Sequence, residues 1–458
     1  MLRNQLNRFF APRDGQQQAY KRVDGEEREA SEEDTEAPAY DVPQTQEFSW
    51  IVYCIFVWMG MAMLWGWNSF LAAAPYFQLR FADNDWVRNN FQSSITSVFC
   101  VTGLAAHFIL LKLQKNASYP LRVIVSLMLI ALVFTILTIS TVAAHGISAA
   151  ALFSLVLPLV FLSSLSSSMN QNGLFAYVSN FSQPAYTQGI LTGQALSGVV
   201  PCIVQLISVF AVSEGSEHQT DELSKASKSA FGSFATAVAV CGCALLAFLY
   251  LYRFQDKRQA ARYFEDDGED TLSSPPVKKV VPLLTLFRKT RWLSLSIFFC
   301  FCITMAFPVF ASKVQSVNKE QPPPRYSQPG VFVALALLFW NSGDLLGRML
   351  VLLPLPGRVK PSPFMLFIFT LARILFIPLF LMCNVGGRGA SINSDFVYLV
   401  LVQGFFGVTN GCICVSTMVR ATEIVDEDEK EPAGAYMGML LVAGLAAGSV
   451  MSFFIGAL

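Results

Sequence analysis

The sequence predicts an all-α polytopic membrane protein with eleven transmembrane helices. Two observations support this prediction. Hydrophobic residues make up 53% of the 458 positions and charged residues only 14%, whereas a soluble chain normally carries about 25% charged residues. The apolar residues also gather in runs of roughly 20, the length that an α-helix needs to cross about 30 Å of hydrocarbon.

The chain begins with a polar segment, residues 1–47, in which a loosely basic stretch precedes an acidic one. Such a segment cannot bury a core, so we predict a disordered cytosolic tail. No apolar h-region precedes the first apolar run near Phe48, which is therefore expected to act as an uncleaved signal-anchor. The predicted spans are 50–73, 89–111, 121–143, 150–178, 186–212, 230–252, 292–311, 330–353, 363–383, 397–419 and 433–456.

One long gap separates the sixth span from the seventh. Residues 253–291 are charged and contain three prolines, so they are predicted to form a cytosolic loop. This loop divides the membrane part into an N-terminal bundle of helices 1–6, within residues 48–252, and a C-terminal bundle of helices 7–11, within residues 292–458.

The distribution of Lys and Arg predicts the orientation. If the N-terminus is cytosolic, 22 of the 32 Lys and Arg residues fall in cytosolic segments, eight in outer segments and two within spans. Cytosolic loops normally carry the excess of basic residues. The N-terminus is therefore predicted to be cytosolic and, with an odd number of spans, the C-terminus lumenal or extracellular.

Several function classes find no support in the sequence. It contains no Walker loop, no G-x-S-x-G motif and no H-E-x-x-H motif, and a 39-residue gap is too short for the nucleotide-binding domain of a pump. The three histidines are far apart, and the Cys-x-Cys pairs fit no zinc or redox spacing. We therefore expect no enzymatic activity, no cofactor, no metal site and no nucleic-acid partner. The oligomeric state is open, and a monomer is compatible with the sequence.

Charged residues inside predicted spans are informative, because burying them in hydrocarbon is costly unless they serve a cavity or a partner. The eighth span contains Asp344, the only acidic side chain within any span, and Arg348 one turn later on the same helix face. They form either an ion pair that only neutralises itself or a polar anchor whose carboxylate accepts hydrogen bonds from solute hydroxyls. Arg373, in the ninth span, is expected at a gate or a helix contact.

Uncharged polar residues also lie deep in the first and fourth spans. Trp67 and Asn68 are too deep for an interfacial aromatic belt, and an aromatic face beside an amide suits a flat heterocycle with polar edges. The fourth span contains a run of serine, asparagine and glutamine that ends in Gln171 and Asn172. Such a run is typical of a helix that lines an aqueous cavity.

Gln92 in the second span and Gln194 in the fifth would add hydrogen-bonding groups to such a cavity, although bonding between helices explains them equally well. Small residues recur every four positions in the fifth and last spans, which permits close helix contact. These residues are Gly189, Gly193 and Ser197, then Gly434 and Gly438, and finally Gly444 and Gly448.

Several of these segments resemble the equilibrative nucleoside transporter family. They are, in chain order, Trp67-Asn68, 72–77, Tyr186-Thr187, 193–198, the D-x-x-G-R motif 344–348, Ala372-Arg373, 409–411 and 433–435. Each motif is short, but the ordered set runs from the first span to the last and covers nearly all of the membrane region.

The resemblance implies a fold of the major facilitator type, six helices against five, that moves by alternating access. It implies facilitative transport of nucleosides, with nucleobases or nicotinamide riboside as further candidate substrates. It also implies that nucleoside contacts come from Trp67, Asp344, Arg348 and a position in the fourth span that is either Gln171 or Asn172. The sequence is most similar to fungal members, which implies the vacuole or another endomembrane rather than the plasma membrane.

Three alternatives remain open at this stage: a proton-coupled nucleoside carrier, a non-transporting protein of the battenin type, and a transporter-like sensor. A proton-coupled carrier needs a group that gains and loses a proton. Asp344 is the only acid in a span, and Arg348 beside it favours the ionised carboxylate. We therefore predict facilitated diffusion without proton coupling.

Overall fold

The computed structural model describes residues 48–113, 117–143, 146–179, 181, 183–211, 219–266, 281–305, 310–311, 313–318, 324–351, 353 and 360–456. The predicted tail, residues 1–47, lies outside these ranges, as do residues 267–280 of the predicted loop.

The described chain is helical, and its only extended pairing is an isolated bridge between Val314 and Val385. The first half contains α3 (Trp50–Ala72), α4 (Ala74–Arg80), α5 (Asp85–Lys112), α6 (Tyr119–Ala143), α7 (Ala149–Ser179), α8 (Pro184–Ala211) and α9 (Gln219–Asp266). The second half contains α10 (Leu283–Thr304), η2 (Arg325–Ser327), α12 (Pro329–Leu350), α13 (Pro363–Ala372), η3 (Arg373–Leu375), α14 (Phe376–Leu381), η4 (Val397–Gly404), α15 (Phe405–Glu423), η5 (Glu427–Glu429) and α16 (Lys430–Gly456).

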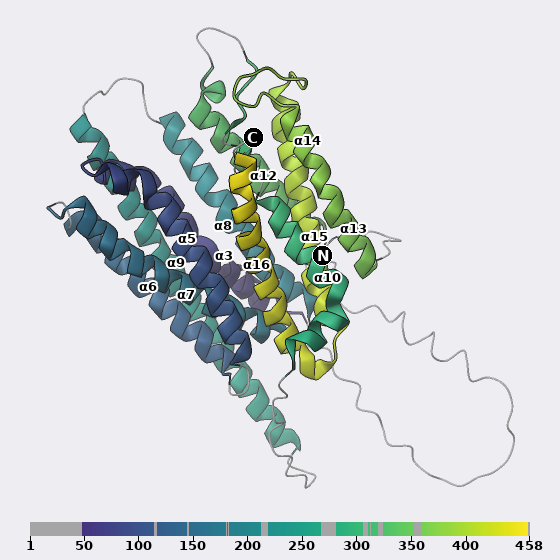
Figure 1. The fold of residues 1–458 in the computed structure, drawn as a ribbon. Helices are drawn as coiled ribbons and strands as arrows, with labels where there is room; N and C mark the ends of the chain where they lie inside the picture. Colours follow the sequence, from purple (N-terminus) through teal and green to yellow (C-terminus); the bar gives the residue numbers. More distant parts are fainter. Residues whose placement is uncertain are drawn as a thin grey trace, which may run out of the picture.

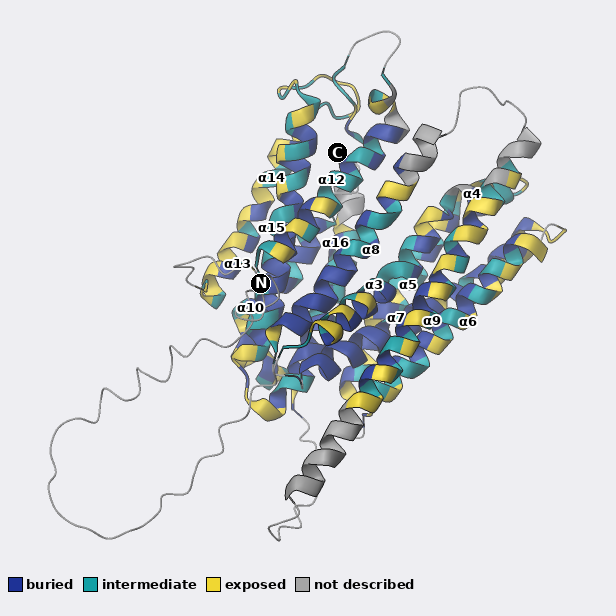
Figure 2. Cartoon of the chain, turned by 180° about the vertical axis from the view of Figure 1, so that it is seen from behind, coloured by how far each residue is buried: buried dark blue, intermediate teal, exposed yellow. Residues whose placement is uncertain are grey.

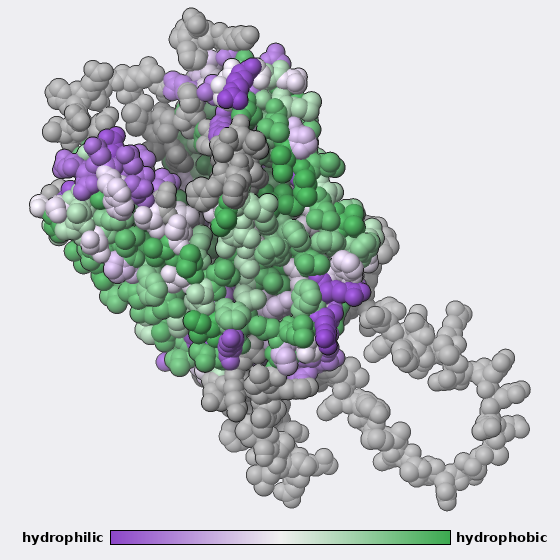
Figure 3. All heavy atoms as spheres, in the orientation of Figure 1, coloured by the Kyte–Doolittle hydropathy of each residue, from purple (hydrophilic) through white to green (hydrophobic). Residues whose placement is uncertain are grey.

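Nine helical segments among the described residues are long and apolar enough to cross a membrane. They coincide with predicted spans one to four, six, and eight to eleven. Helices α8 and α10 occupy the places of the other two predicted spans, but neither is among the nine. Figure 3 shows hydrophobic side chains along the sides of the molecule and hydrophilic ones gathered near its ends, as expected for an integral membrane protein. The count of eleven transmembrane helices stays a prediction.

The helical structure extends into both ends of the predicted loop 253–291. Helix α9 continues to Asp266, and α10 begins at Leu283, eight residues before the end of that loop. Helix α10 is bent at Thr290, whose backbone angles (φ −110°, ψ 18°) are not helical. The first two turns of α10 therefore run in a different direction from the rest of the helix.

The two halves of the chain pack together at one end (Figure 1). At the end that is predicted to be cytosolic, one continuous apolar core includes Phe56 and Phe175 from the first half and Leu286 and Met418 from the second. Figure 2 shows buried residues concentrated where the halves meet at this end. The two halves are therefore in close apolar contact here, and van der Waals packing between helices contributes to holding them together.

Toward the predicted outer end, each half has an apolar core of its own. One surrounds Phe77 and Phe134 in the first half, and another surrounds Phe310 and Phe380 in the second. A small cluster centred on Leu206 of α8, against α12, joins the halves at this level. The interface between the halves is thus more extensive at the predicted cytosolic end.

The predicted small-residue stripes lie at helix contacts, which confirms their expected role in packing. A side chain at Gly193 would collide with the backbone of α3 at Val57, one at Gly434 with α7, and one at Gly444 with α10. Because these neighbours are backbone atoms, they cannot move aside as a flexible side chain can. The glycines therefore set the distance between the helices.

The predicted orientation can be tested with two single cysteines in a background without accessible native thiols. Arg253, in α9 just after the sixth predicted span, and Arg388, in the turn after α14, are both exposed. With the N-terminus in the cytosol, we expect a membrane-impermeant maleimide to label Arg253→Cys only from the cytosolic side and Arg388→Cys only from the other. Labelling of both cysteines from the same side would contradict the predicted topology.

Candidate functional site

The site in the second half is built by close contact between α12 and α15. Gly343 and Gly347 of α12 lie against the backbone of η4 and α15, and Gly407 and Gly411 lie against the backbone of α12. Without Cβ atoms at these positions the two helices approach closely enough for short polar side chains to meet. The contact places Asn410 directly opposite Asp344.

Asp344 is held by two donors from two helices. The Arg348 guanidinium forms an ion pair with Asp344 (Nη2 to Oδ2, 2.8 Å), and the side chains are 6% and 5% exposed. The Asn410 amide donates to the other carboxylate oxygen (Nδ2 to Oδ1, 2.7 Å). Both donors stabilise a negative charge at Asp344, and the ion pair as a unit is neutral.

Arg348 also joins the two halves of the molecule. Its guanidinium donates to the Leu191 carbonyl of α8, while the Gln188 amide of α8 donates to the Arg348 carbonyl (Nε2 to O, 3.3 Å). The Gln188 side chain in turn accepts a hydrogen bond from the Tyr53 hydroxyl of α3 (3.2 Å). The Asp344–Arg348 pair is therefore part of a polar contact between the halves.

Arg373 is fully buried and lies at a helix contact inside the second half. Its guanidinium donates to the Cys300 carbonyl (2.8 Å) and to the Thr304 hydroxyl (3.1 Å), and it lies 4.4 Å from the centre of the Phe406 ring. The Thr304 hydroxyl donates to Asn410 Oδ1 (2.8 Å). A continuous chain of hydrogen bonds thus links Arg373 through Thr304 and Asn410 to Asp344.

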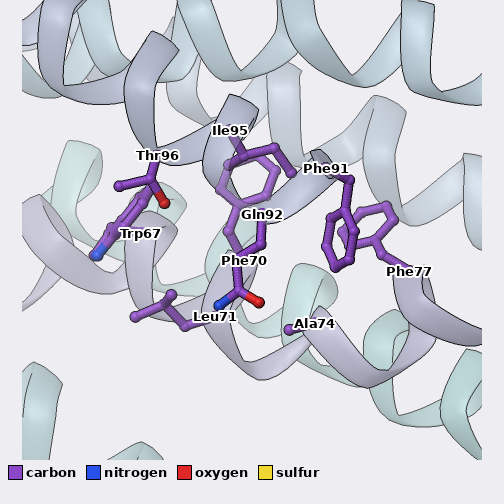
Figure 4. Close-up of a pocket in the computed structure, with 9 residues that line it drawn as sticks. All are labelled: Trp67, Phe70, Leu71, Ala74, Phe77, Phe91, Gln92, Ile95 and Thr96. Atoms are coloured by element: carbon purple, nitrogen blue, oxygen red, sulfur yellow. The ribbon is translucent and has the colours of Figure 1, made fainter. Parts of the chain in front are cut away.

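A second group of predicted site residues lies in the first half. Trp67 and Gln92 line a small, partly open pocket between α3, α4 and α5, with a volume of about 20 Å³. The other lining residues are Phe70, Leu71, Ala74, Phe77, Phe91, Ile95 and Thr96. Figure 4 shows Trp67 and Thr96 at one end of the pocket, Phe77 and Phe91 at the other, and Gln92 between them. The pocket combines aromatic surface with one amide and one hydroxyl.

Asn68 and Gln194 lie at the contact between α3 and α8. The Asn68 amide donates to the Ser197 carbonyl (2.6 Å), and the Gln194 amide donates to the Met63 sulfur (3.0 Å). Both side chains are thus committed to bonds between helices, which is the second of the two interpretations that the sequence left open for Gln194.

The two candidates in the fourth span face different neighbours. Asn172 accepts a hydrogen bond from the Arg122 guanidinium of α6 (2.6 Å), inside the first half. The Gln171 amide points across the interface to the Gly438 carbonyl of α16, at the limiting distance of 3.5 Å. Of the two, only Gln171 reaches the other half, and its bond is at the upper limit of hydrogen-bond length.

Asn410 and Gln188 are site residues that the sequence did not reveal. Asn410 lies in the motif 409–411, but nothing in the sequence indicates that it contacts Asp344. The available signal was the spacing of Gly343 and Gly347, which matches that of Gly407 and Gly411 and predicts a close contact between two helices.

The chain is similar to known nucleoside transporters in sequence and to solved transporters in fold. A family model described as "Nucleoside transporter" matches residues 157–457. The chain is 28% identical to Nucleoside transporter FUN26 of Saccharomyces cerevisiae, over 91% of this chain and 86% of that protein. It is 25% identical to Equilibrative nucleoside transporter 1 of Homo sapiens, over 91% of this chain and 99% of that protein.

Solved transporters share the fold at low sequence identity. The E. coli fucose:proton symporter FucP is similar with a TM-score of 0.57 at 13% identity, over 89% of this chain and 92% of that one. The proton:xylose symporter XylE, of the major facilitator superfamily, is similar with a TM-score of 0.59 at 11% identity, over 89% of each chain. The predicted major-facilitator type of fold is therefore confirmed, whereas the division into six and five helices stays a prediction.

Proposed function

This chain belongs to the nucleoside transporter family, and we propose that it carries nucleosides across a membrane by facilitated diffusion between its two halves. The observation that carries this proposal is the buried Asp344–Arg348–Asn410 group beside the interface with α8. A buried ion pair is weak support for stability alone, since its desolvation offsets much of its attraction. A role in binding and gating accounts for its presence in a helix of the membrane region.

The chemistry of a nucleoside matches the two groups of polar residues. A base offers a flat face and polar edges, which suit the Trp67 ring with Gln92 and Thr96 close by. A ribose offers hydroxyl groups, which suit the carboxylate of Asp344 as acceptor and the guanidinium of Arg348 as donor. Gln171, on the first half, supplies an amide at the interface with α16.

Alternating access gives the Arg348 contacts a second role. When the halves separate at the predicted cytosolic end, the bonds from Arg348 to Leu191 and from Gln188 to Arg348 must break. Groups in a solute that replace these bonds lower the cost of separation, because a buried polar group without a partner is unfavourable. Binding of the solute is thereby coupled to the movement of the halves.

The decisive experiment is uptake of radiolabelled uridine by proteoliposomes that contain the purified protein. We expect uptake down the uridine gradient, and no net accumulation when uridine is equal on both sides and an inward proton gradient is imposed. The reason is that Asp344, the only acid within the predicted spans, is committed to an ion pair with Arg348 and to a hydrogen bond from Asn410. Absence of any uptake would instead favour the sensor or battenin-like alternatives.

Uphill uptake that collapses on addition of a protonophore would contradict facilitated diffusion. Two buried groups would then be tested as the proton carrier, by Asp344→Asn and by His107→Gln. His107 is buried on α5, its Nδ1 lies 2.9 Å from the Gly103 carbonyl, and its Nε2 has no hydrogen-bond partner among the described residues. If one variant still transports uridine but no longer responds to the proton gradient, the residue replaced in that variant is the proton-carrying group.

The stacking role of Trp67 gives a separate prediction. Trp67→Ala is expected to weaken nucleoside binding roughly fivefold, and Trp67→Phe by less, because an aromatic face contributes about 1 kcal/mol beyond simple burial. Binding is measured by isothermal titration of the purified variants. Trp58→Ala, on the same helix but bonded to Val240 of α9, is the matched control and should bind as the wild type does. Equal losses in both Trp67 variants would exclude stacking.

The orientation in the membrane and the cellular location are proposed from the sequence alone. The basic residues favour a cytosolic N-terminus and a lumenal or extracellular C-terminus. The similarity to fungal members favours the vacuole or another endomembrane over the plasma membrane. Transport of nucleobases or nicotinamide riboside can be tested in the same proteoliposomes by competition with uridine.

A further inference from the structure

The first turns of α10 expose an unusual combination of side chains. Leu284 is 59% and Phe287 39% exposed, Arg288 is exposed on the same helical turns, and Arg291 is exposed just past the bend at Thr290. The opposite face, with Leu286, Thr290 and Leu293, is buried in the protein. The exposed face is thus held in a fixed orientation, with apolar residues at one end and basic residues at the other.

Arg288 and Arg291 differ from the other basic residues near them. Lys289, between the two, pairs with Asp426 (2.7 Å) and Glu429 (2.6 Å). Lys360 likewise pairs with Glu423. Over the part of the chain that the structure describes, no carboxylate forms an ion pair with Arg288 or Arg291. Two exposed guanidinium groups without an ion-pair partner among the described residues therefore lie within one short stretch of α10.

The surroundings of this stretch indicate the level of the membrane interface. The Arg291 guanidinium lies 5.2 Å from the centre of the Trp292 ring, and Trp292 packs edge-on against Phe364 of α13 (4.9 Å between centres). Helices α10 and α13 lie side by side here (Figure 1). Tryptophan beside arginine at the end of a membrane helix is typical of the headgroup region.

The bend at Thr290 explains the exposed apolar residues. In a straight helix, Leu284 and Phe287 would extend past the two arginines into water, where exposed apolar surface is unfavourable. Because α10 bends at Thr290, its first two turns can lie along the membrane surface instead. Amphipathic helices in this position bury their apolar residues at the acyl boundary while their basic residues contact phosphates.

We propose that the exposed face of residues 284–292 binds the headgroup of an anionic lipid, with Arg288 and Arg291 on its phosphate and Leu284 and Phe287 at the acyl boundary. The lipid would occupy the leaflet on the side where α10 begins, which is the predicted cytosolic side. Since anionic lipids are concentrated in the cytosolic leaflet, the site and the predicted orientation agree. Binding at the start of α10 would anchor the second half of the transporter to one leaflet.

The test is a titration of the full-length purified protein with phosphatidylserine or phosphatidylcholine, followed by native mass spectrometry. We expect tighter binding of phosphatidylserine, and a roughly 30-fold loss of its affinity in the double variant Arg288→Gln/Arg291→Gln, which corresponds to about 1 kcal/mol for each basic side chain. Arg288→Lys/Arg291→Lys keeps the charge and should keep most of the affinity. Lys228→Gln/Arg388→Gln, which removes the same charge from exposed outer positions, is the matched control and should bind as the wild type does.

Three results would overturn the proposal. They are equal affinity for the two lipids, unchanged phosphatidylserine affinity in the Arg→Gln double variant, and complete displacement by inorganic phosphate, which would identify a site for the free ion. A melting curve of each variant in detergent verifies that it is folded. Because the titration contains no nucleoside, its outcome is independent of the proposed transport function.

Discussion

Replacement of Asp344 by alanine is expected to reduce nucleoside uptake roughly 100-fold, since hydrogen bonds to a charged group contribute up to about 3 kcal/mol. The carboxylate is the only acidic acceptor within the predicted spans. Its removal also leaves Arg348 buried without a counter-charge, which is expected to destabilise the protein by about 3–5 kcal/mol. The measurement is therefore uridine uptake per folded molecule, with a melting curve for the same preparation. Uptake at the wild-type rate would exclude the proposed role.

A double variant distinguishes nucleoside binding by Asp344 from neutralisation of the Arg348 charge. Asp344→Ala/Arg348→Ala removes both charges, so it should regain much of the stability that Asp344→Ala loses. If Asp344 binds the nucleoside, uptake stays low in the double variant although the fold recovers. Recovery of uptake together with stability would show that the ion pair only neutralises itself, the alternative that the sequence left open.

Replacement of Gly411 by valine is expected to destabilise the protein by about 3 kcal/mol or more, because overpacking a close helix contact forces backbone shifts. A Cβ at this position would collide with the Asp344 carbonyl and the Arg348 amide nitrogen of α12. Separation of α12 from α15 would also break the bond from Asn410 to Asp344. We expect a lower melting temperature in detergent and loss of uptake.

Gly242→Val is the matched control for this substitution. Gly242 also lies within a membrane helix, α9, but a Cβ there would meet no atom within 4 Å. The same change in side chain and helix propensity should therefore leave the melting temperature close to that of the wild type. Equal melting temperatures for the Gly411 and Gly242 variants would contradict the proposed contact between α12 and α15.

The sequence alone predicted the class of fold and the candidate polar residues within the membrane spans. Nine of the predicted spans coincide with apolar helices, because the length and hydropathy of a span are local properties of the chain. Asp344, Arg348 and Arg373 could be identified because any charge in such a span is costly and needs a reason. The predicted limits of α10 were less accurate, since its first turns are amphipathic rather than uniformly apolar.

Only the tertiary structure decided which polar groups meet. The spacing of Asp344 and Arg348 predicted their ion pair, but the bond from Asn410 joins residues 66 positions apart on different helices. The partners of the two fourth-span candidates were also not predictable. Asn172 bonds with Arg122 within the first half, whereas its neighbour Gln171 reaches α16 in the second half. Adjacent residues on a helix point about 100° apart, so their partners depend on how each helix is rotated against its neighbours. Interleaved glycines set that rotation and the distance between helices, and their effect exists only once the helices are packed.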